Sequence, residues 1–309
     1  MLSSIILILP YFGKFNNYFP FFLASCRNNP TVNWLIITDD KAKYNYPENV
    51  RVIYMTFEQF RALIQNYFEF KISLEKPYKL CDFKPAYGLI LQNEIQGYDF
   101  WGYCDNDVIW GDIRRFLTEE ILDGKEKVLS RGHLSIYRNN NRMINFFKSS
   151  TDGLYKIVFT NPKGFAFDEW GNNGIANYLK RVLNETEFWD GLPFDDFLTT
   201  SGNFKPAQKL DKGYINSIYY YDKGQLIRYY QTAATGSEIL SESVLYTHFQ
   251  KRPLEVETSN VDNFMIVPNK IIEPIEVNSY SIESLGRDKL INYQYLRIKV
   301  ANIKRRLKL

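Results

Sequence analysis

Residues 98–107 read Tyr98-Asp99-Phe100-Trp101-Gly102-Tyr103-Cys104-Asp105-Asn106-Asp107, an aromatic run that ends in two carboxylates one residue apart. We expect a buried strand over Asp99–Cys104, with the acidic tripeptide at its carboxyl end. A turn directly after a strand can bring both carboxylates to one point, where they suit a hard cation such as Mg²⁺ or Mn²⁺. Such a cation neutralises a departing diphosphate. Because Asp-x-Asp also makes ordinary turns, its meaning depends on the surrounding sequence.

Strand and helix patterns alternate on both sides of this stretch. The predicted strands are Ser4–Leu9, Val32–Thr38, Val50–Tyr54, Val128–Ser130, Leu134–Tyr137 and Val244–Gln250, with a hairpin around Asp222-Lys223-Gly224. The predicted helices are Tyr18–Cys26, Phe57–Tyr67, Lys84–Gln96, Ile113–Leu122, Arg142–Ser149 and Gly171–Leu183. This alternation predicts an α/β fold with a Rossmann-type central sheet flanked by helices. We expect a catalytic domain over residues 1–255 and a C-terminal appendage over residues 256–309.

Composition limits the classes of function. The chain has 309 residues, of which 45% are hydrophobic, so it can bury a sizeable core. Its cysteines, Cys26, Cys81 and Cys104, are few and scattered, which is typical of a reducing cytoplasm. The apolar run Ile5–Leu9 is too short to cross a bilayer and is interpreted as a buried first strand. The net charge is +3, but basic residues concentrate in residues 286–309, so the body is mildly acidic and nucleic acid is not an expected partner.

Two further strand ends carry polar or aromatic residues. Ligands of parallel α/β sheets bind beyond the carboxyl ends of the strands. Tyr11 and Gly13 follow the first predicted strand, and Gly13 permits close approach of the backbone. Asp39 and Asp40 follow the second strand, where they suit hydrogen bonds to ribose hydroxyls or a uracil N–H, although they also fit a polar turn. Dinucleotide and Walker-type phosphate sites are disfavoured, because the sequence lacks their glycine-rich motifs.

In layout, residues 1–255 resemble the nucleotide-sugar glycosyltransferases of the GT-A fold, which place an Asp-x-Asp motif after a central strand. The segment Lys79-Leu80-Cys81-Asp82-Phe83-Lys84 stands before this strand. The resemblance implies that Asp105 and Asp107 bind the metal and that Asn106 lies with them at the nucleotide. It also implies that Lys84 contacts the nucleotide or its phosphates and that Asp82 orients Lys84. Lys84 also fits a solvated position at the start of a helix.

The segment Leu245-Tyr246-Thr247-His248-Phe249-Gln250-Lys251-Arg252-Pro253 resembles the late His-Phe segment of retaining transferases such as glycogenin and bacterial lipopolysaccharide galactosyltransferases. The resemblance implies that His248 is the third metal ligand and that Lys251 holds the diphosphate. The segment departs from the fuller Gly-x-x-Lys-Pro-Trp pattern of that family, which weakens the assignment of Lys251. A structural role for His248 is the alternative.

Asp168 and Glu169 are the predicted catalytic residues. In an inverting enzyme one of them would be the general base that removes the acceptor proton. In a retaining enzyme the same position would orient the acceptor or stabilise an oxocarbenium-like state. The alternative is a helix cap, because carboxylates are favourable at the start of a helix.

The sequence therefore predicts a glycosyltransferase dependent on Mn²⁺ or Mg²⁺, with a UDP-sugar donor and a saccharide acceptor that is lipid-linked, in cell-surface polysaccharide synthesis. Retention is slightly favoured over inversion. Leu296, Val300, Ile303 and Leu307 form one stripe in the basic tail, which suits an anionic membrane surface at the inner face of a bacterial membrane. A solvated tail helix is the alternative there. The rival functions are a nucleotidyltransferase and a non-catalytic carbohydrate-binding relative.

Overall fold

The computed structural model describes residues 2–149, 153–169, 174–184, 186–191, 193–197, 214–250 and 252–286, together with Leu296, Val300 and Ile303. The chain divides into two compact units. The first comprises residues 1–15, 30–106 and 117–191, and the second comprises residues 16–29, 107–116 and 192–309. These units are defined by their internal contacts. The predicted division at residue 255, between a catalytic domain and an appendage, is of a different kind and stays a prediction.

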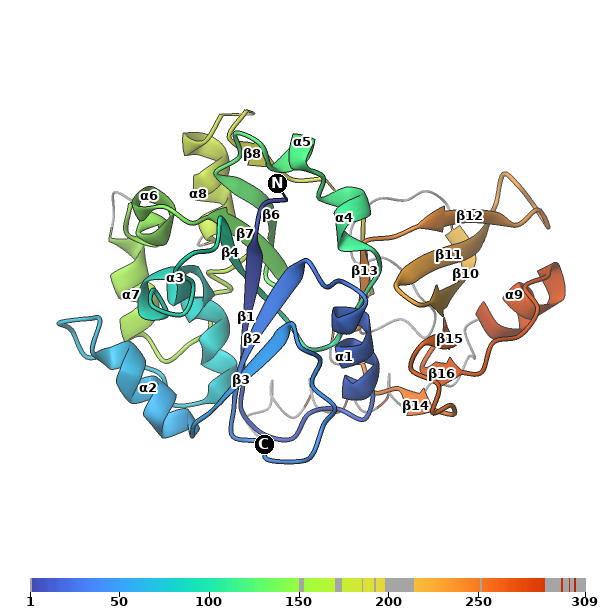
Figure 1. Ribbon diagram of the computed structural model, residues 1–309, viewed down its shortest axis with the longest axis horizontal. Coiled ribbons are helices and arrows are strands. Elements are labelled where there is room, and N and C mark those ends of the chain that lie inside the picture. Colours follow the sequence, from blue (N-terminus) through green and yellow to red (C-terminus); the bar gives the residue numbers. More distant parts are fainter. Residues whose placement is uncertain are drawn as a thin grey trace. The chain divides into compact units, whose positions relative to one another are not determined.

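A seven-stranded mixed sheet forms the centre of the first unit, in the order β3-β2-β1-β4-β7-β6-β8 (Figure 1). Its strands are β1 (Ile5–Tyr11), β2 (Val32–Thr38), β3 (Val50–Tyr54), β4 (Phe100–Cys104), β6 (Lys127–Arg131), β7 (Leu134–Arg138) and β8 (Phe188–Trp189). Strands β3, β2, β1 and β4 are parallel, whereas β7 is antiparallel to β4. The predicted α/β fold with a central mixed sheet is confirmed.

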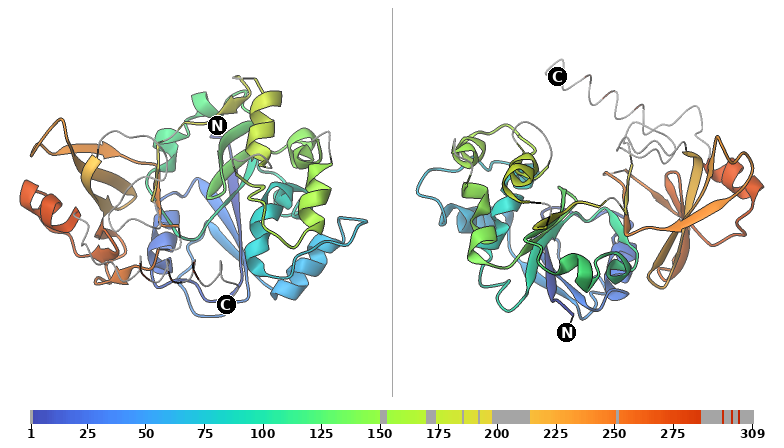
Figure 2. Two further views of the ribbon diagram at one scale, coloured as in Figure 1. Left: turned by 180° about the vertical axis from the view of Figure 1, so that it is seen from behind. Right: turned by 90° about the horizontal axis from the view of Figure 1, so that it is seen from above.

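Helices cover one face of this sheet. They are α2 (Phe57–Gln65), η1 (Pro77–Ala86), α3 (Tyr87–Ile90), α6 (Asn141–Ile144), η2 (Phe146–Lys148), α7 (Leu154–Thr160) and α8 (Ile175–Val182), while the short α5 (Glu119–Leu122) belongs to the same unit. Figures 1 and 2 show α2, α3, α6 and α7 on the same side of the sheet. Their apolar residues form one core with alternate residues of the central strands, such as Ile6 and Ile8 of β1 and Trp101 and Tyr103 of β4. The core thus fixes the central strands and the loops at their ends.

Glycine allows β4 and β7 to approach closely at the centre of the sheet. A Cβ on Gly102 would lie 2.4 Å from the Ser135 carbonyl oxygen and 3.0 Å from Leu7 Cδ2. Any side chain there would push β4, which leads to the acidic tripeptide, away from β7. Gly102 therefore belongs to the scaffold that positions Asp105.

The predicted helix over Lys84–Gln96 is wrong. The chain forms the 3₁₀ helix η1, which begins at Pro77, and then a single α-helical turn in α3. Because η1 starts so early, Pro85 lies inside the helical region, where it lacks the N–H of a continuous α-helix. The Lys79, Asp82 and Lys84 side chains are buried, so this segment presents charged groups to the interior.

The helix predicted over Ile113–Leu122 is two short helices, α4 (Ile113–Phe116) and α5. Asp112 caps the first as predicted, accepting the Arg114 N–H at 3.1 Å. Thr118 caps the second, accepting the Ile121 N–H at 3.3 Å. The second cap breaks the helix because its own backbone is extended.

Other predicted elements are also shorter or divided in the structure. The region predicted as Arg142–Ser149 contains α6 and η2, and the strand predicted over Val244–Gln250 is limited to Tyr246–His248. The helix predicted over Gly171–Leu183 is described from Ile175, and its predicted start at residues 171–173 lies outside the described residues.

The second unit contains two sheets. The six-stranded sheet has the order β12-β11-β10-β15-β16-β14 and the three-stranded sheet has the order β5-β13-β9. Their strands are β5 (Val108–Trp110), β9 (Asp195–Asp196), β10 (Tyr214–Asp222), β11 (Gln225–Thr232), β12 (Leu240–Ser243), β13 (Tyr246–His248), β14 (Glu255–Val256), β15 (Asn263–Val267) and β16 (Lys270–Ile272). The helices of this unit are α1 (Phe19–Arg27), α4 and α9 (Ser279–Gly286).

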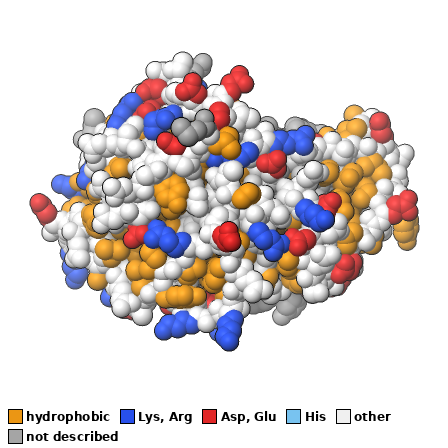
Figure 3. Space-filling model, viewed as in Figure 1, with side chains coloured by type: hydrophobic (Ala, Val, Ile, Leu, Met, Phe, Trp, Pro, Cys, Tyr) orange, Lys and Arg blue, Asp and Glu red, His pale blue; other side chains and the backbone are white. Residues whose placement is uncertain are grey.

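The predicted hairpin is the β10–β11 pair, which turns at Lys223 and Gly224. Both turn residues have positive φ angles, +45° and +95°, as a tight two-residue hairpin requires. On one face of the six-stranded sheet, Ile282 of α9 packs with Ile218 and Met265. On the face of the molecule shown in Figure 3, basic and acidic side chains are interspersed, with hydrophobic side chains between them.

Candidate active site

In the first unit, a buried lysine binds the first aspartate of the tripeptide. Asp105 directly follows β4, and its N–H donates to the His133 carbonyl oxygen at 3.4 Å. Lys84 Nζ donates to Asp105 Oδ1 at 2.7 Å and to the Gly132 carbonyl oxygen at 2.8 Å. Because only 7% of the Lys84 side chain is exposed, its ammonium group is a fixed internal charge beside the end of β4.

The same ammonium group faces the predicted catalytic acid Asp168. Lys84 Nζ lies 3.4 Å from Asp168 Oδ2. Burial opposes the charge of Lys84, but Asp105 and Asp168 contribute to raising its pKa well above the ordinary value. Burial raises the pKa of Asp168 to about 7 against the attraction of Lys84, and the neighbouring Glu169 and Asp105 add to the rise. Lys84 therefore stays charged, while Asp168 titrates near neutrality.

The two predicted catalytic acids, Asp168 and Glu169, differ in their burial. Asp168 is 4% exposed and its backbone oxygen accepts from the Tyr103 hydroxyl at 3.2 Å, whereas Glu169 is exposed. A Cβ on Gly132 would lie 2.5 Å from Glu169 Oε1 and 2.6 Å from Asp168 Oδ2, so the turn before β7 packs directly on both carboxylates. Glu169 is therefore open to solvent, whereas Asp168 faces Lys84.

Asp82 has different partners from those predicted. Its carboxylate accepts from Lys79 Nζ at 2.7 Å and from the backbone N–H groups of Phe165 and Phe167 at 3.0 and 2.9 Å. These bonds fix the loop that leads directly into Asp168. Asp82 thus positions the loop before Asp168. Lys84, which Asp82 was predicted to orient, is instead held by Asp105 and the Gly132 carbonyl oxygen.

The ends of β1 and β2 are joined by the predicted acidic pair. Asp39 Oδ1 accepts the Gly13 N–H at 2.7 Å, and Asp40 Oδ2 accepts the Phe15 N–H at 3.1 Å. Tyr11 stacks on Phe15 with ring centroids 4.8 Å apart. These residues lie at one edge of the sheet, where the two carboxylates hold the loop as a polar turn would. Their role in binding a nucleotide stays a prediction.

In the second unit, Asp107 and His248 lie together. Strands β5 and β13 are antiparallel, and the Phe249 N–H donates to the Asp107 carbonyl oxygen at 2.9 Å. This pairing places His248 Nε2 3.3 Å from Asp107 Oδ1, with both residues buried. Asp107 follows Asp105 after one residue, so the two Cα atoms lie within about 7 Å of each other by covalent geometry alone.

Sequence reasoning missed Asp196, which contacts the other side of the His248 ring. Asp196 Oδ1 lies 2.8 Å from His248 Nδ1 and accepts from Gln250 Nε2 at 2.7 Å. Burial alone would lower the pKa of His248, but Asp107 and Asp196 outweigh it and raise the pKa to about 10. The pair Asp195-Asp196 was visible in the sequence, but no motif distinguished it from other acidic pairs.

Asn106 offers a buried hydrogen-bond donor between the two aspartates. The residue is 9% exposed, and its Nδ2 has no hydrogen-bond partner among the residues that the structure describes. A buried amide without a partner is costly, so it favours a ligand with acceptor oxygens. Lys251, the predicted diphosphate ligand, lies outside the described residues.

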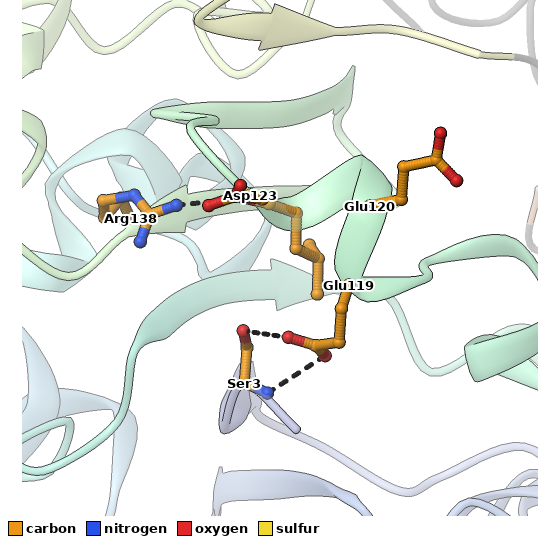
Figure 4. Close-up of a pocket in the computed structure, with 6 residues that line it drawn as sticks. Ser3, Glu119, Glu120, Asp123 and Arg138 are labelled. Carbon is orange, nitrogen blue, oxygen red and sulfur yellow. Dashed lines mark hydrogen bonds between the residues drawn. The ribbon is translucent and has the colours of Figure 1, made fainter. Parts of the chain in front are cut away.

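A pocket of about 340 Å³ lies at the opposite edge of the first unit's sheet (Figure 4). It is lined by Ser3, Glu119, Glu120, Leu122, Asp123 and Arg138. Ser3 precedes β1 and donates from Oγ to Glu119 at 2.6 Å. The pocket therefore lies at the amino end of β1, away from the strand ends that carry Asp39 and Asp105.

Comparison with known proteins assigns the chain to a family. The profile of a family of unknown function (DUF6625) matches residues 7–274. The chain belongs to this family. The DUF6625 match spans every predicted site residue, from Tyr11 to Lys251. No curated protein matches the chain at a significant level.

Solved structures give weak likenesses. The galactosyltransferase LgtC, in complex with donor and acceptor sugar analogues, is 14% identical, with a TM-score of 0.34 over 63% of this chain and 75% of that one. An active-site mutant of LgtC is 11% identical, with a TM-score of 0.40 over 81% and 88%. The glycosyltransferase GlyE of Streptococcus pneumoniae TIGR4 is 9% identical, with a TM-score of 0.33 over 62% and 45%. At these scores the likenesses carry no argument about function.

Among the described residues, no helix is both long enough and apolar enough to cross a membrane.

Proposed function

We propose that this chain is a metal-dependent glycosyltransferase that moves a sugar from a UDP-sugar to a saccharide acceptor. One observation carries the proposal: β5 and β13 bring His248 to 3.3 Å from Asp107, the second carboxylate of the acidic tripeptide. Asp105 is a third donor group of this set, because it precedes Asp107 by two positions in the chain. Two carboxylates and one imidazole form a donor set that suits Mn²⁺ and also accommodates Mg²⁺.

The residues present fit such an ion. Asp105, Asp107 and His248 would hold it, and the bound ion would neutralise charge on the departing diphosphate. The buried Asn106 Nδ2 is a donor suited to the anionic oxygens of the same ligand. Lys84 acts on this site through Asp105, whose carboxylate it holds at 2.7 Å.

The nucleoside of the donor is proposed to bind at the ends of β1 and β2. In the strand order β3-β2-β1-β4, the direction of winding changes between β1 and β4, where ligands of open α/β sheets bind. Tyr11, Gly13, Asp39 and Asp40 lie at this edge, and Gly13 and Asp39 are exposed. Lys251 is proposed as a further diphosphate ligand on its sequence resemblance alone.

Glu169 is the acid proposed to meet the acceptor, because it is exposed whereas Asp168 is buried against Lys84. In a retaining transfer, which the resemblance of the His248 segment favours slightly, Glu169 would orient the acceptor hydroxyl. In an inverting transfer, Glu169 would take the proton of the acceptor hydroxyl while the hydroxyl oxygen attacks the sugar and UDP departs. In both cases Asp168 and Lys84 position the loop and Asp105.

The acceptor is proposed to be lipid-linked, with the enzyme acting at the inner face of a bacterial membrane in surface polysaccharide synthesis. This part of the proposal rests on the basic, amphipathic pattern of residues 286–309, of which the structure describes only Leu296, Val300 and Ile303 beyond α9. All three described tail residues are exposed.

The deciding experiment is a screen of donor hydrolysis across UDP- and GDP-sugars, with and without Mn²⁺, using the wild-type chain and Asp107→Ala. We expect Mn²⁺-dependent release of UDP and free sugar that Asp107→Ala abolishes, and unchanged turnover in the exposed control Asp262→Ala of the same unit. Release of UMP and a sugar phosphate would instead indicate a nucleotidyltransferase. Binding of UDP without turnover would favour the non-catalytic relative, and turnover unaffected by Asp107→Ala would refute the metal site.

A further inference from the structure

The imidazole of His248 is held between two carboxylates on its opposite nitrogens. Nε2 lies 3.3 Å from Asp107 Oδ1, and Nδ1 lies 2.8 Å from Asp196 Oδ1. All three side chains belong to the second unit and are buried, with 6% to 12% of each side chain exposed. The ring therefore has one nitrogen directed at the acidic tripeptide and the other at Asp196.

The backbone fixes this arrangement. Strands β9 and β13 run parallel with Asp196 opposite His248, and the Phe197 N–H donates to the His248 carbonyl oxygen at 3.1 Å. Residues opposite each other on neighbouring strands share a face of the sheet, so their side chains meet without a long reach. The contact follows from strand register and not from a chance encounter of surface groups.

Gln250 adds a second donor to the same carboxylate oxygen. Its Nε2 lies 2.7 Å from Asp196 Oδ1, and its backbone adopts φ of +49°, which is uncommon for a residue other than glycine. Asp195, the preceding residue, turns away to Arg228 and to the Tyr219 hydroxyl, at 2.5 and 2.9 Å. The two adjacent aspartates therefore have separate surroundings, and only Asp196 has a described contact with His248.

We infer that Asp196 is a positioning residue for His248: it accepts the Nδ1 proton, so that the Nε2 lone pair is presented on the side of Asp107. Gln250 in turn fixes the Asp196 carboxylate. The inference rests on the proposed function, in which Asp107 and His248 bind a divalent ion. A carboxylate behind a ligating histidine sets its tautomer and makes it a more basic ligand, and loss of such a partner typically weakens metal affinity about 10- to 100-fold.

The first test measures Mn²⁺ affinity of the full chain by the EPR signal of free Mn²⁺. We expect Asp196→Asn to bind Mn²⁺ about 10- to 100-fold more weakly than wild type. Gln250→Met should show a smaller loss, because it leaves the Asp196–His248 contact in place. Asp262→Asn makes the same chemical change at an exposed aspartate of the same unit and should bind Mn²⁺ as wild type does.

The second test needs no Asp196 variant, so it can be carried out even if that variant does not fold. The chain has two histidines, His133 and His248, so ¹⁵N-histidine labelling gives two spin systems that His133→Gln assigns. With Zn²⁺ as a diamagnetic stand-in, we expect His248 to bind the ion through Nε2 and to keep the proton on Nδ1.

The outcomes separate this inference from the function on which it rests. Zinc on Nδ1, or wild-type Mn²⁺ affinity in Asp196→Asn while Asp107→Asn loses binding, would overturn the role of Asp196 and leave the proposed metal site standing. Failure of the wild-type chain to bind Mn²⁺ would overturn both.

Discussion

Individual charges at the end of β4 depend on one another. Lys84 is shared between Asp105 at 2.7 Å and Asp168 at 3.4 Å, and all of these contacts lie within the first unit. Removing one member of a buried charged group leaves the remaining charge without compensation, at a cost of about 3–5 kcal/mol. Variants that preserve the charges but disturb their geometry are therefore more informative than deletions of Lys84.

Gly132→Ala is such a variant. The new Cβ would meet Glu169 Oε1 at 2.5 Å and Asp168 Oδ2 at 2.6 Å, closer than real Cβ contacts allow. We expect the free energy of unfolding to fall by about 1–3 kcal/mol, as for other overpacked sites, and the transferase activity proposed for this chain to fall with it.

Gly164→Ala is the matched control, because a Cβ there meets no atom within 4 Å and the residue lies in the same unit. Urea unfolding of both variants measures the difference. Equal stability of the two variants would show that the turn at Gly132 has room for a side chain and does not press on the acids.

The raised pKa of Asp168 predicts a pH dependence of stability. Its folded pKa of about 7 lies above the ordinary value of 3.8, so the folded state binds the proton more tightly. The contribution of this group is therefore fully favourable below about pH 4 and is lost as the pH rises toward 7. In Asp168→Asn this loss is absent.

The measurement compares urea midpoints of wild type and Asp168→Asn between about pH 4 and pH 6, a window below the ordinary pKa of histidine. We expect the stability of the variant relative to wild type to increase with pH across this window. A difference that stays constant with pH would mean that the folded and unfolded pKa values of Asp168 are the same.

At the scale of elements, η1 contains a buried ion pair, and its carboxylate also binds the loop before Asp168. Lys79 and Asp82 lie 2.7 Å apart with 6% and 2% of their side chains exposed, and Asp82 also accepts from the backbone of Phe165 and Phe167. Asp82 of the 3₁₀ helix thus holds the loop that leads into Asp168.

Asp82→Asn leaves the buried Lys79 without a carboxylate, and we expect a loss of about 3–5 kcal/mol in the free energy of unfolding. The double variant Lys79→Met/Asp82→Asn should recover part of this loss, because the unpaired charge is gone and the asparagine oxygen can still accept backbone hydrogen bonds.

Chemical denaturation of the single and double variants tests this coupling. Glu75→Gln provides the comparison, since its partner Arg61 lies 3.7 Å away at an exposed pair, for which we expect at most about 1 kcal/mol. Additive losses in the double variant would show that Lys79 and Asp82 do not stabilise each other.

At the scale of the whole molecule, the basic tail predicts salt-sensitive association with anionic membranes. Each Lys or Arg near an anionic surface contributes about 1 kcal/mol, and added salt screens this attraction. Liposome co-sedimentation of the full chain and of a chain ending at residue 285 measures the effect. We expect the full chain to sediment with anionic vesicles at low salt and the truncated chain to remain in solution; equal binding by both would refute a role of the tail.

The sequence by itself determined the central strands and the acidic edge of the sheet. Continuous apolar runs such as Ile5–Leu9 have a single physical outcome, burial in the middle of a sheet, and polar residues directly after them must lie at its edge. For that reason Asp39, Asp40 and Asp105 were predictable as neighbours of strand ends. The failed helix over Lys84–Gln96 shows the limit, since charged residues that turn inward look the same in sequence as charged residues that face water.

Only the tertiary structure decided which groups meet across long stretches of chain. The contact between Asp107 and His248 depends on the register of β5 and β13, and the contact with Asp196 depends on the register of β9 and β13. Register is set by the burial of whole strands and leaves no local signal in an acidic pair. The exposure of Glu169 and the burial of Asp168 beside Lys84 are likewise decided by the folded chain, because two adjacent carboxylates look the same in sequence.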